Sequence, residues 1–446
     1  NNAGDAIQSG GNNNTLVGNE AGTAITTGDR NTAVGFEALK TATTAQYNVA
    51  VGYQALENNT GNNNTAVGDQ ALEACTSGTN NTAMGDDAGV SVTTGEQNVL
   101  IGTSAGDALT DADYNVAIGS DALGADTKGS RSVAIGRRAL HAQNFTSATD
   151  TYNTAVGFEA GNDITTGQSN VLVGGLAGDA ITTGDHNVAI GRDALHANTA
   201  GNKSVGIGSS ALYSQNITSD SDGYNVALGF NAGYNLTTGT ENTLIGSQVA
   251  SGDAITGANN TCVGYAAGHA LTSGSNNLFL GHDAGRAASP SGNIAGGNNK
   301  VCLGDDNITH LFCADTSISS SDSRDKADIT DFSIGLNWIK DLRPVTYKWD
   351  KRSWYGTDEE PYGTPDGSKK KSKVNIGFLA QEVLEVEKAN GFGDSANNML
   401  VCDVTEDEQR YGVKYERLVP VLVNAIKELS AKNDALEARI KKLEDG

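Results

Sequence analysis

Short apolar runs, each closed by a glycine, recur along the first 305 residues of the chain. The motif is an Asn, three mostly apolar residues and a Gly, as in residues 31–35 (Asn-Thr-Ala-Val-Gly) and 187–191 (Asn-Val-Ala-Ile-Gly). Most copies are 17 residues apart, two steps are 21, and the last is 23. The closing glycines are Gly18, Gly35, Gly52, Gly68, Gly85, Gly102, Gly119, Gly136, Gly157, Gly174, Gly191, Gly208, Gly229, Gly246, Gly264, Gly281 and Gly304. Repetition this regular predicts stacked units that share one continuous core.

The residues of one unit predict a coil of a parallel β-solenoid. Each Thr-Ala-Val-like run favours a short strand, and the glycine after it permits backbone conformations that other residues avoid. A 17-residue unit cannot bury an apolar face alone, whereas stacked units can. We expect Ala alternating with Val, Ile or Leu to fill a narrow interior. We also expect the recurrent Asn to stack from coil to coil and satisfy amide hydrogen bonds.

The two 21-residue steps insert four residues at related places. The segments are residues 141–147 (His-Ala-Gln-Asn-Phe-Thr-Ser) and 213–219 (Tyr-Ser-Gln-Asn-Ile-Thr-Ser). Protruding loops at such positions are candidates for contact with a receptor. Neutral drift after an internal duplication explains the same pattern more simply.

The last 30 residues show a second periodicity, with apolar residues at alternating three- and four-residue steps. The series is Val419, Leu422, Ile426, Leu429, Asn433, Leu436, Ile440 and Leu443. This spacing predicts the a/d seam of a coiled coil, in which Asn433 at an a position sets the register. Ile at a with Leu at d by itself favours two strands. A helix that packs on its own domain after Leu429 is the alternative.

Composition divides the chain near residue 320. Residues 1–320 contain 10 Lys and Arg against 29 Asp and Glu, while residues 321–446 contain 20 against 24. All three Trp lie in the second part, and the chain as a whole has 56 Gly and a net charge of −23. Two segments of different chemistry therefore meet at this point.

Charge and composition also argue against several classes of partner, namely nucleic acids, membranes and metal ions. An acidic chain lacks the Lys and Arg excess that nucleic-acid phosphates require, and no apolar run approaches the roughly 20 residues of a membrane-spanning helix. The five cysteines are widely spread, without metal-ligand or disulfide spacing. We therefore expect no nucleic acid, membrane insertion, metal or cofactor. Because the chain starts without Met or a signal segment, we expect a fragment whose N-terminal attachment region is missing.

The repeats resemble the β-roll heads of trimeric bacterial adhesins, and similar repeats occur in phage fibre shafts. Residues 342–349 (Leu-Arg-Pro-Val-Thr-Tyr-Lys-Trp), residues 376–383 (Ile-Gly-Phe-Leu-Ala-Gln-Glu-Val) and the terminal heptads follow in order. This set resembles the intramolecular chaperone domain of phage endosialidases, tail spikes and fibres. Both resemblances imply three chains. The expected fold is a mainly β, trimeric parallel β-roll, followed by a small α+β chaperone domain that ends in a trimeric coiled coil.

The predicted division of the chain follows from these segments. It comprises fibre repeats (1–305), a junction (306–320), a chaperone and autoprotease domain (321–412) and a coiled-coil helix (413–446).

The resemblance also implies a catalytic site at the start of the chaperone domain. There the family carries Ser-Asp-x-Arg-x-Lys, which matches residues 321–326 (Ser-Asp-Ser-Arg-Asp-Lys). By this resemblance Ser321 attacks the peptide bond between Ser320 and Ser321, and Lys326 accepts the hydroxyl proton. Asp322 and Arg324 belong to the motif as supporting residues. Without the resemblance, this Ser-rich stretch reads as a polar linker.

The implied protein is a phage tail fibre segment, assembled in the cytoplasm of the bacterial host and carried on the virion. It would cleave itself once as a serine endopeptidase with a Ser-Lys dyad. Its expected partners are two further copies of itself, other tail proteins through the missing N-terminal region, and a host-surface receptor such as a glycan.

Two alternatives use the same repeats for other functions. One is a trimeric adhesin with a trimerisation domain that does not cleave. The other is an ice-binding solenoid, which needs a regular array of Thr. Val replaces that Thr in many units, including Val99, Val116, Val133, Val171 and Val188.

Overall fold

The computed structural model describes residues 2–308, 323–356, 360, 362–395, 397–404 and 410–445. The chain divides into two compact units. Unit 1 comprises Asn1–Ala284 and Ala295–Leu303, and unit 2 comprises Gly285–Ile294 and Gly304–Gly446.

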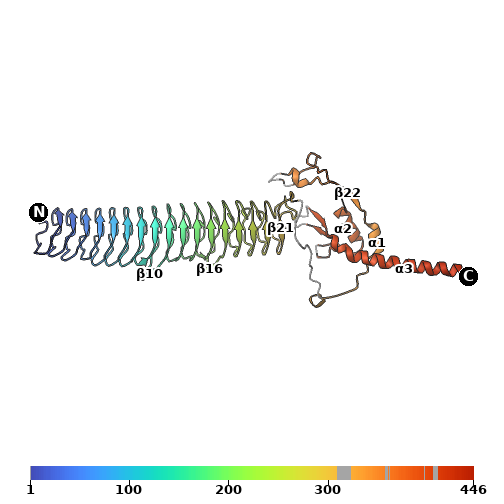
Figure 1. Ribbon diagram of the computed structural model, residues 1–446, viewed down its shortest axis with the longest axis horizontal. Helices are drawn as coiled ribbons and strands as arrows, with labels where there is room; N and C mark the ends of the chain where they lie inside the picture. The colour runs from blue at the N-terminus through green and yellow to red at the C-terminus, as the bar shows by residue number, and fades with distance from the viewer. Residues whose placement is uncertain are drawn as a thin grey trace. The chain divides into compact units, whose positions relative to one another are not determined.

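Unit 1 is a parallel β-solenoid, as the repeats predict, with one three-residue strand in each coil (Figure 1). Every strand pairs in register with the equivalent strand of the next coil, so that Ala33 of one coil lies beside Ala50 of the next. The strands of this 17-stranded sheet are β1 (Thr15–Val17), β2 (Thr32–Val34), β3 (Val49–Val51), β4 (Thr65–Val67), β5 (Thr82–Met84), β6 (Val99–Ile101), β7 (Val116–Ile118), β9 (Val133–Ile135), β11 (Thr154–Val156), β12 (Val171–Val173), β13 (Val188–Ile190), β15 (Val205–Ile207), β17 (Val226–Leu228), β18 (Thr243–Ile245), β19 (Thr261–Val263), β20 (Leu278–Leu280) and β21 (Val301–Leu303).

The interior of the solenoid is filled by the middle residue of nearly every strand and by residues three and four positions after most of the repeat glycines. Ala33, Ala38 and Leu39 of one coil are all fully buried. The first and third strand residues, such as Thr32 and Val34, are instead only half-buried, because side chains alternate across a strand. The expectation that Val and Ile share the interior with Ala is therefore wrong for these strands. They lie on the outer face of the sheet.

The repeat glycine is required by the close approach of successive coils. Gly35 has a φ of +148°, and a Cβ at this position would lie 2.0 Å from the carbonyl oxygen of Gly52. No L-residue fits this contact without moving the backbone. The 17-residue period is therefore tied to a column of glycines.

The recurrent Asn forms the predicted ladder along the stack. The backbone N–H of Asn48 donates to Oδ1 of Asn31 at 3.0 Å, and its own Nδ2 donates to the carbonyl of Gly61 at 3.0 Å. Each fully buried amide thus satisfies polar groups of two neighbouring coils.

The ladder changes at the two longer coils, where Ser132 and Ser204 replace Asn. In the first of them the side chain of Gln143, which is fully buried, supplies the missing amide. Its Nε2 donates to Oγ of Ser132 at 2.9 Å and to Asp126 at 2.6 Å, while its Oε1 accepts from Asn153 at 2.8 Å. Gln143, from the inserted segment, therefore makes the buried side-chain hydrogen bonds that an Asn makes in the other coils.

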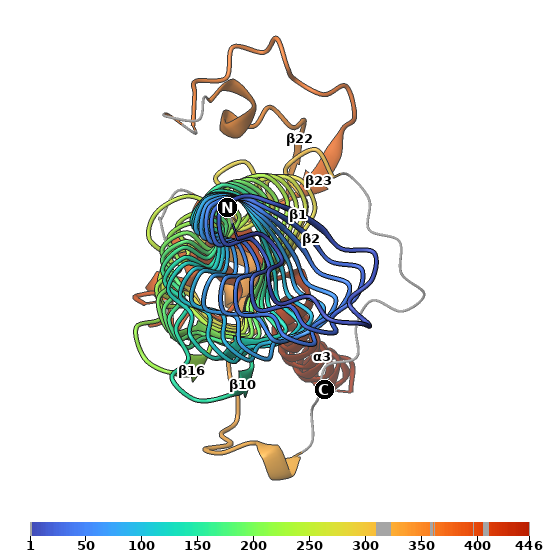
Figure 2. The same cartoon turned by 90° about the vertical axis from the view of Figure 1, so that its left-hand side faces the viewer.

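The second insertion repeats this arrangement. Gln215 donates to Oγ of Ser204 at 3.0 Å and accepts from Nδ2 of Asn225 at 3.0 Å. Each insertion also adds a short parallel pair of strands, and the labelled strands β10 (Thr149–Asp150) and β16 (Ser221–Asp222) lie on the same side of the coils (Figure 2). The pairs are β8 (Gly129–Ser130) with β10 (Thr149–Asp150), and β14 (Gly201–Asn202) with β16 (Ser221–Asp222). The insertions therefore have a structural role that neither interpretation of the sequence included.

Unit 2 contains a small α+β fold. Its elements are η1 (Ser323–Asp325), α1 (Leu336–Asp341), β22 (Val345–Tyr347), η2 (Arg352–Tyr355), β23 (Asn375–Gly377), α2 (Ala380–Ala389), β24 (Cys402–Val404), β25 (Tyr411–Val413), η3 (Tyr415–Arg417) and α3 (Leu418–Glu444). β22 pairs antiparallel with β23, and β24 with β25. The core consists of Trp338, Leu342, Val383, Leu384, Val401, Cys402, Leu418 and Val421.

Helix α3 is buried only at its start. Leu418, Val421 and Ala425 pack inwards, whereas all residues from 429 to 445 are exposed. The alternative that the helix packs on its own domain after Leu429 is therefore wrong for this chain. Among the described residues, no helix has the length and apolar character needed to cross a membrane.

Buried cysteines lie in both units. Burial raises the pKa of the Cys75 thiol to about 11 and that of the Cys262 thiol to about 12. Both thiols therefore stay protonated at neutral pH and act as small apolar fillers.

Candidate functional site

The predicted catalytic motif lies only partly within the described residues. Ser320, Ser321 and Asp322 lie outside them. Arg324 lies in η1 with an exposed side chain, and Lys326 follows with an exposed side chain. The backbone N–H of Lys326 approaches the carbonyl of Ser323 at 3.4 Å, which closes a tight turn.

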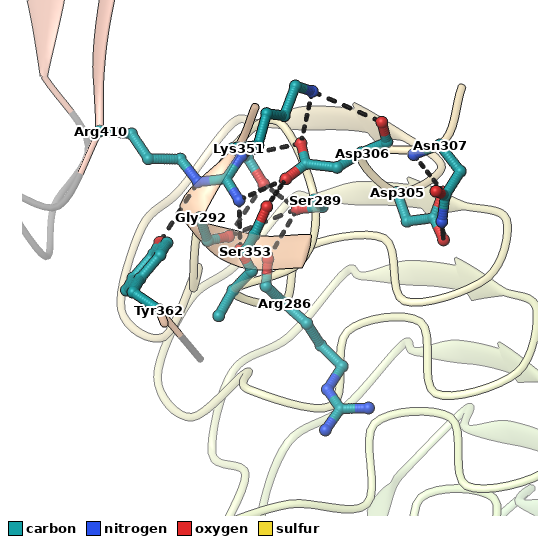
Figure 3. A network of polar contacts seen from close by, with 12 residues as sticks. Arg286, Ser289, Gly292, Asp305, Asp306, Asn307, Lys351, Ser353, Tyr362 and Arg410 are labelled. Atoms are coloured by element: carbon teal, nitrogen blue, oxygen red, sulfur yellow. Dashed lines mark hydrogen bonds and ion pairs between the residues drawn. The ribbon is translucent and has the colours of Figure 1, made fainter. Parts of the chain in front are cut away.

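A second polar site in unit 2 is centred on Asp306, shortly after the last repeat glycine (Figure 3). Arg410 donates to both carboxylate oxygens of Asp306, at 2.9 and 2.7 Å. Lys351 adds an ion pair at 3.2 Å, and the hydroxyl of Ser353 donates to the same carboxylate. The side chains of Asp306 and Arg410 are only 3% and 17% exposed. A bidentate guanidinium-carboxylate pair is among the strongest side-chain contacts in proteins.

Opposing effects determine the ionisation of Asp306. Burial by itself raises the pKa of this carboxyl. The hydrogen bonds from Arg410 and Ser353 and the charges of Arg410 and Lys351 outweigh burial, so the pKa lies below its ordinary value. The carboxylate stays ionised at neutral pH with its oxygens engaged, so Asp306 acts as an anchor and not as an acid or base.

The residues just before β21 complete this site. Arg410 donates to the carbonyl of Ala287, and its Nε donates to the hydroxyl of Tyr362 at 3.2 Å. The backbone N–H of Asp306 donates to the carbonyl of Ala288 at 2.7 Å. Arg410 therefore holds two chain segments that precede the chaperone domain, residues 285–294 and 304–308.

Aromatic and basic side chains surround the anchor. The ammonium of Lys351 lies 5.2 Å from the ring centre of Trp349, and Lys371 lies 4.8 Å from that of Trp354. We expect the Lys369–Lys371 run to be a solvated loop. The run is indeed exposed, but the backbone N–H of Lys371 donates to the carbonyl of Trp349 at 2.9 Å.

Sequence reasoning did not find the Asp306 site. Asp306 and Arg410 are 104 residues apart and belong to no recognisable motif. Asp306 is also one of many acidic residues in a strongly acidic chain. Only the folded arrangement distinguishes it. The described residues contain no group of three or more His, Cys, Asp or Glu that is placed to hold a metal ion.

Comparison with known proteins bears on the second part of the chain. The family described as chaperone of endosialidase matches residues 321–392, beginning at the Ser321 of the predicted motif. This family comprises intramolecular chaperones with self-cleaving serine peptidase activity. No curated protein matches the chain. Residues 321–392 thus match the chaperone-of-endosialidase family, in a chain whose first part is a parallel β-solenoid.

Proposed function

We propose that this chain is a segment of a phage tail fibre whose C-terminal domain directs its own assembly and then cuts itself off. The family match at residues 321–392, placed directly after a long solenoid, carries this proposal. Stacked repeats pose a folding problem, because each coil can pair with a wrong neighbour at little cost. A terminal domain that aligns the chains first would let folding spread from one register.

Two apolar surfaces, one of them partly exposed and the other exposed, support assembly as a homotrimer. The first is the outer face of the solenoid sheet, where the third residue of all 17 strands is Val, Ile, Leu or Met. The second is the a/d series of α3, in which Ile426 is 67% and Leu436 57% exposed. Continuous apolar surfaces of this kind are typical of interfaces, and both would be covered by further copies of the same chain.

The proposed cleavage is an acyl transfer within the chain. Neutral Lys326 takes the proton of the Ser321 hydroxyl, and that oxygen attacks the carbonyl carbon of Ser320. The oxyanion collapses to an ester as the amine of Ser321 leaves. Water then hydrolyses the ester. The products are residues 1–320 with a new carboxylate and residues 321–446 with a new amine. We assign Asp322 and Arg324 to supporting this motif.

The exposure of Lys326 suggests how cleavage could depend on assembly. A lysine acts as a base when it is removed from water, and Lys326 is exposed in the single chain. We propose that neighbouring chains cover Lys326 in the trimer. Cutting would then follow assembly and would leave the fibre kinetically trapped.

The remaining parts of the proposal concern the mature fibre. We assign residues 1–320 to the virion, with attachment to other tail proteins and to a host-surface receptor such as a glycan. The repeated insertions at β10 and β16, which extend on one side of the solenoid, are the surfaces that we propose for contact with the receptor.

A matched pair of helix variants tests trimerisation by α3. Leu436 lies at a d position of the seam and Ala438 at the outward f position, and both are exposed in the single chain. We expect Leu436→Glu to abolish the trimer and leave the chain uncut, because charges disrupt a coiled-coil core. Ala438→Glu should behave like the parent.

The measurements are light scattering after size exclusion and denaturing gels. The parent should have the mass of three chains. A trimeric and normally processed Leu436→Glu chain would contradict the proposed role of α3.

A further inference from the structure

The Asp306 site connects chain segments from the two sides of the proposed cut. Asp306 precedes the bond between Ser320 and Ser321, whereas Lys351, Ser353 and Arg410 follow it. After cleavage, these contacts would join two separate polypeptides.

The contacts are of a kind that can hold two polypeptides together. The Asp306–Arg410 pair is bidentate and nearly enclosed, so dissolved salt screens it much less than an exposed pair. Lys351 and Ser353 occupy further lone pairs of the carboxylate. Removing either partner would take the bidentate contact away from a charge that stays buried, which is costly.

The attachment involves more than a single ion pair. Arg410 also donates to the carbonyl of Ala287. Residues 285–294 and 304–308 belong to unit 2 together with the chaperone domain, although they precede the proposed cut. The chaperone domain therefore already binds both segments through contacts that do not depend on the intervening peptide.

We propose that Asp306 and Arg410 form a latch that keeps the released chaperone bound to the new end of the fibre after cleavage. The partner of residues 321–446 is thus the chain's own N-terminal product, recognised through its buried carboxylate. This inference rests on the proposed self-cleavage. Cutting alone then does not free the chaperone, and its loss requires a second event that breaks the latch.

The test compares denaturing gels with size exclusion under native conditions. The parent should appear as two bands on the gel and as one species in the native run. Arg410→Gln and Asp306→Asn should still be cut but release the small product about 30-fold faster, as expected when one member of a buried charge pair is lost. Arg343→Gln is the matched control, because Arg343 pairs with Glu382 and both lie after the cut.

Two outcomes would overturn the latch. One is separation of the parent's products at neutral pH and moderate salt. The other is equal retention of the small product by the parent, Arg410→Gln and Asp306→Asn. If Arg410→Gln does not fold, Ser353→Ala should give a smaller acceleration in the same direction.

A further variant separates failure of the latch from failure of self-cleavage. Ser321→Ala with a specific protease sequence inserted between residues 309 and 319 can be cut in vitro. The products should stay together by the same contacts even if the parent never cleaves itself. Prompt separation of these products would contradict the latch whatever the outcome for Ser321.

Discussion

Glu387 is a fully buried acidic side chain in α2, where an unpaired charge would be unstable. Its carboxylate accepts hydrogen bonds from the backbone N–H groups of Leu400, Val401 and Cys402. One side chain thereby fixes the segment that leads into β24. The sequence offers no sign of this role, because Glu387 follows two other glutamates in the same helix.

Replacement of Glu387 should destabilise the chaperone domain. We expect Glu387→Ala to lower the free energy of unfolding by about 2–4 kcal/mol, since three backbone N–H donors, two of them buried, lose their acceptor. Glu385→Ala, an exposed residue of the same helix, should change it by less than about 0.5 kcal/mol. Tryptophan fluorescence during denaturant unfolding is the measurement, because all three Trp lie after residue 320. Equal effects of the two variants would contradict the assignment.

Single residues also show how far prediction from sequence reaches. The Ser-Asp-x-Arg-x-Lys match predicts a candidate site at Ser321 and Lys326, because a local motif carries its own spacing. Since Ser321 lies outside the described residues, this site stays a prediction. Asp306 and Arg410 could not be found in this way, since their pairing depends on how distant segments fold together.

At the scale of the element, the repeat specifies the coil almost completely. The glycine column and the Asn ladder could both be predicted from the 17-residue repeat, because each coil contacts only its neighbours. The orientation of the strand side chains could not be predicted, since a three-residue run is too short to show which of its faces is buried. Val34 and its equivalents therefore lie outside, where interior positions were expected.

The inserted Gln gives the sharpest test of the ladder. We expect Gln143→Ala to reduce hydrogen-exchange protection across residues 126–153, because Ser132, Asp126 and Asn153 lose a shared buried partner. The local opening free energy should fall by about 2–3 kcal/mol. Thr146→Ala, an exposed position of the same insertion, serves as the control.

The readout is exchange followed by mass spectrometry, with residues 31–64 as an internal reference that should not change. Unchanged protection of residues 126–153 in Gln143→Ala would show that the amide is not needed there.

At the scale of the whole molecule, the chain combines a repetitive solenoid with a small domain whose peptide link to it is cut in the proposed mechanism. Each strand of the solenoid pairs with the equivalent strand of the next coil, and the coils are closely alike, so many registers offer similar contacts. In the proposed mechanism, the correct register is therefore set from one end. The family match, the exposed seam of α3 and the apolar outer face of the sheet agree with this division of roles. The latch at Asp306 extends it, because the template would remain on the fibre after its peptide link is cut.

Intact-mass measurement of the purified chain tests self-cleavage between Ser320 and Ser321. We expect two polypeptides in the parent, ending at Ser320 and beginning at Ser321, but one uncut chain in Ser321→Ala and in Lys326→Met. Ser323→Ala, a change to a neighbouring hydroxyl, should be cut like the parent. A parent of full-length mass in a folded trimer, or a Ser321→Ala chain cut at the same bond, would contradict the account.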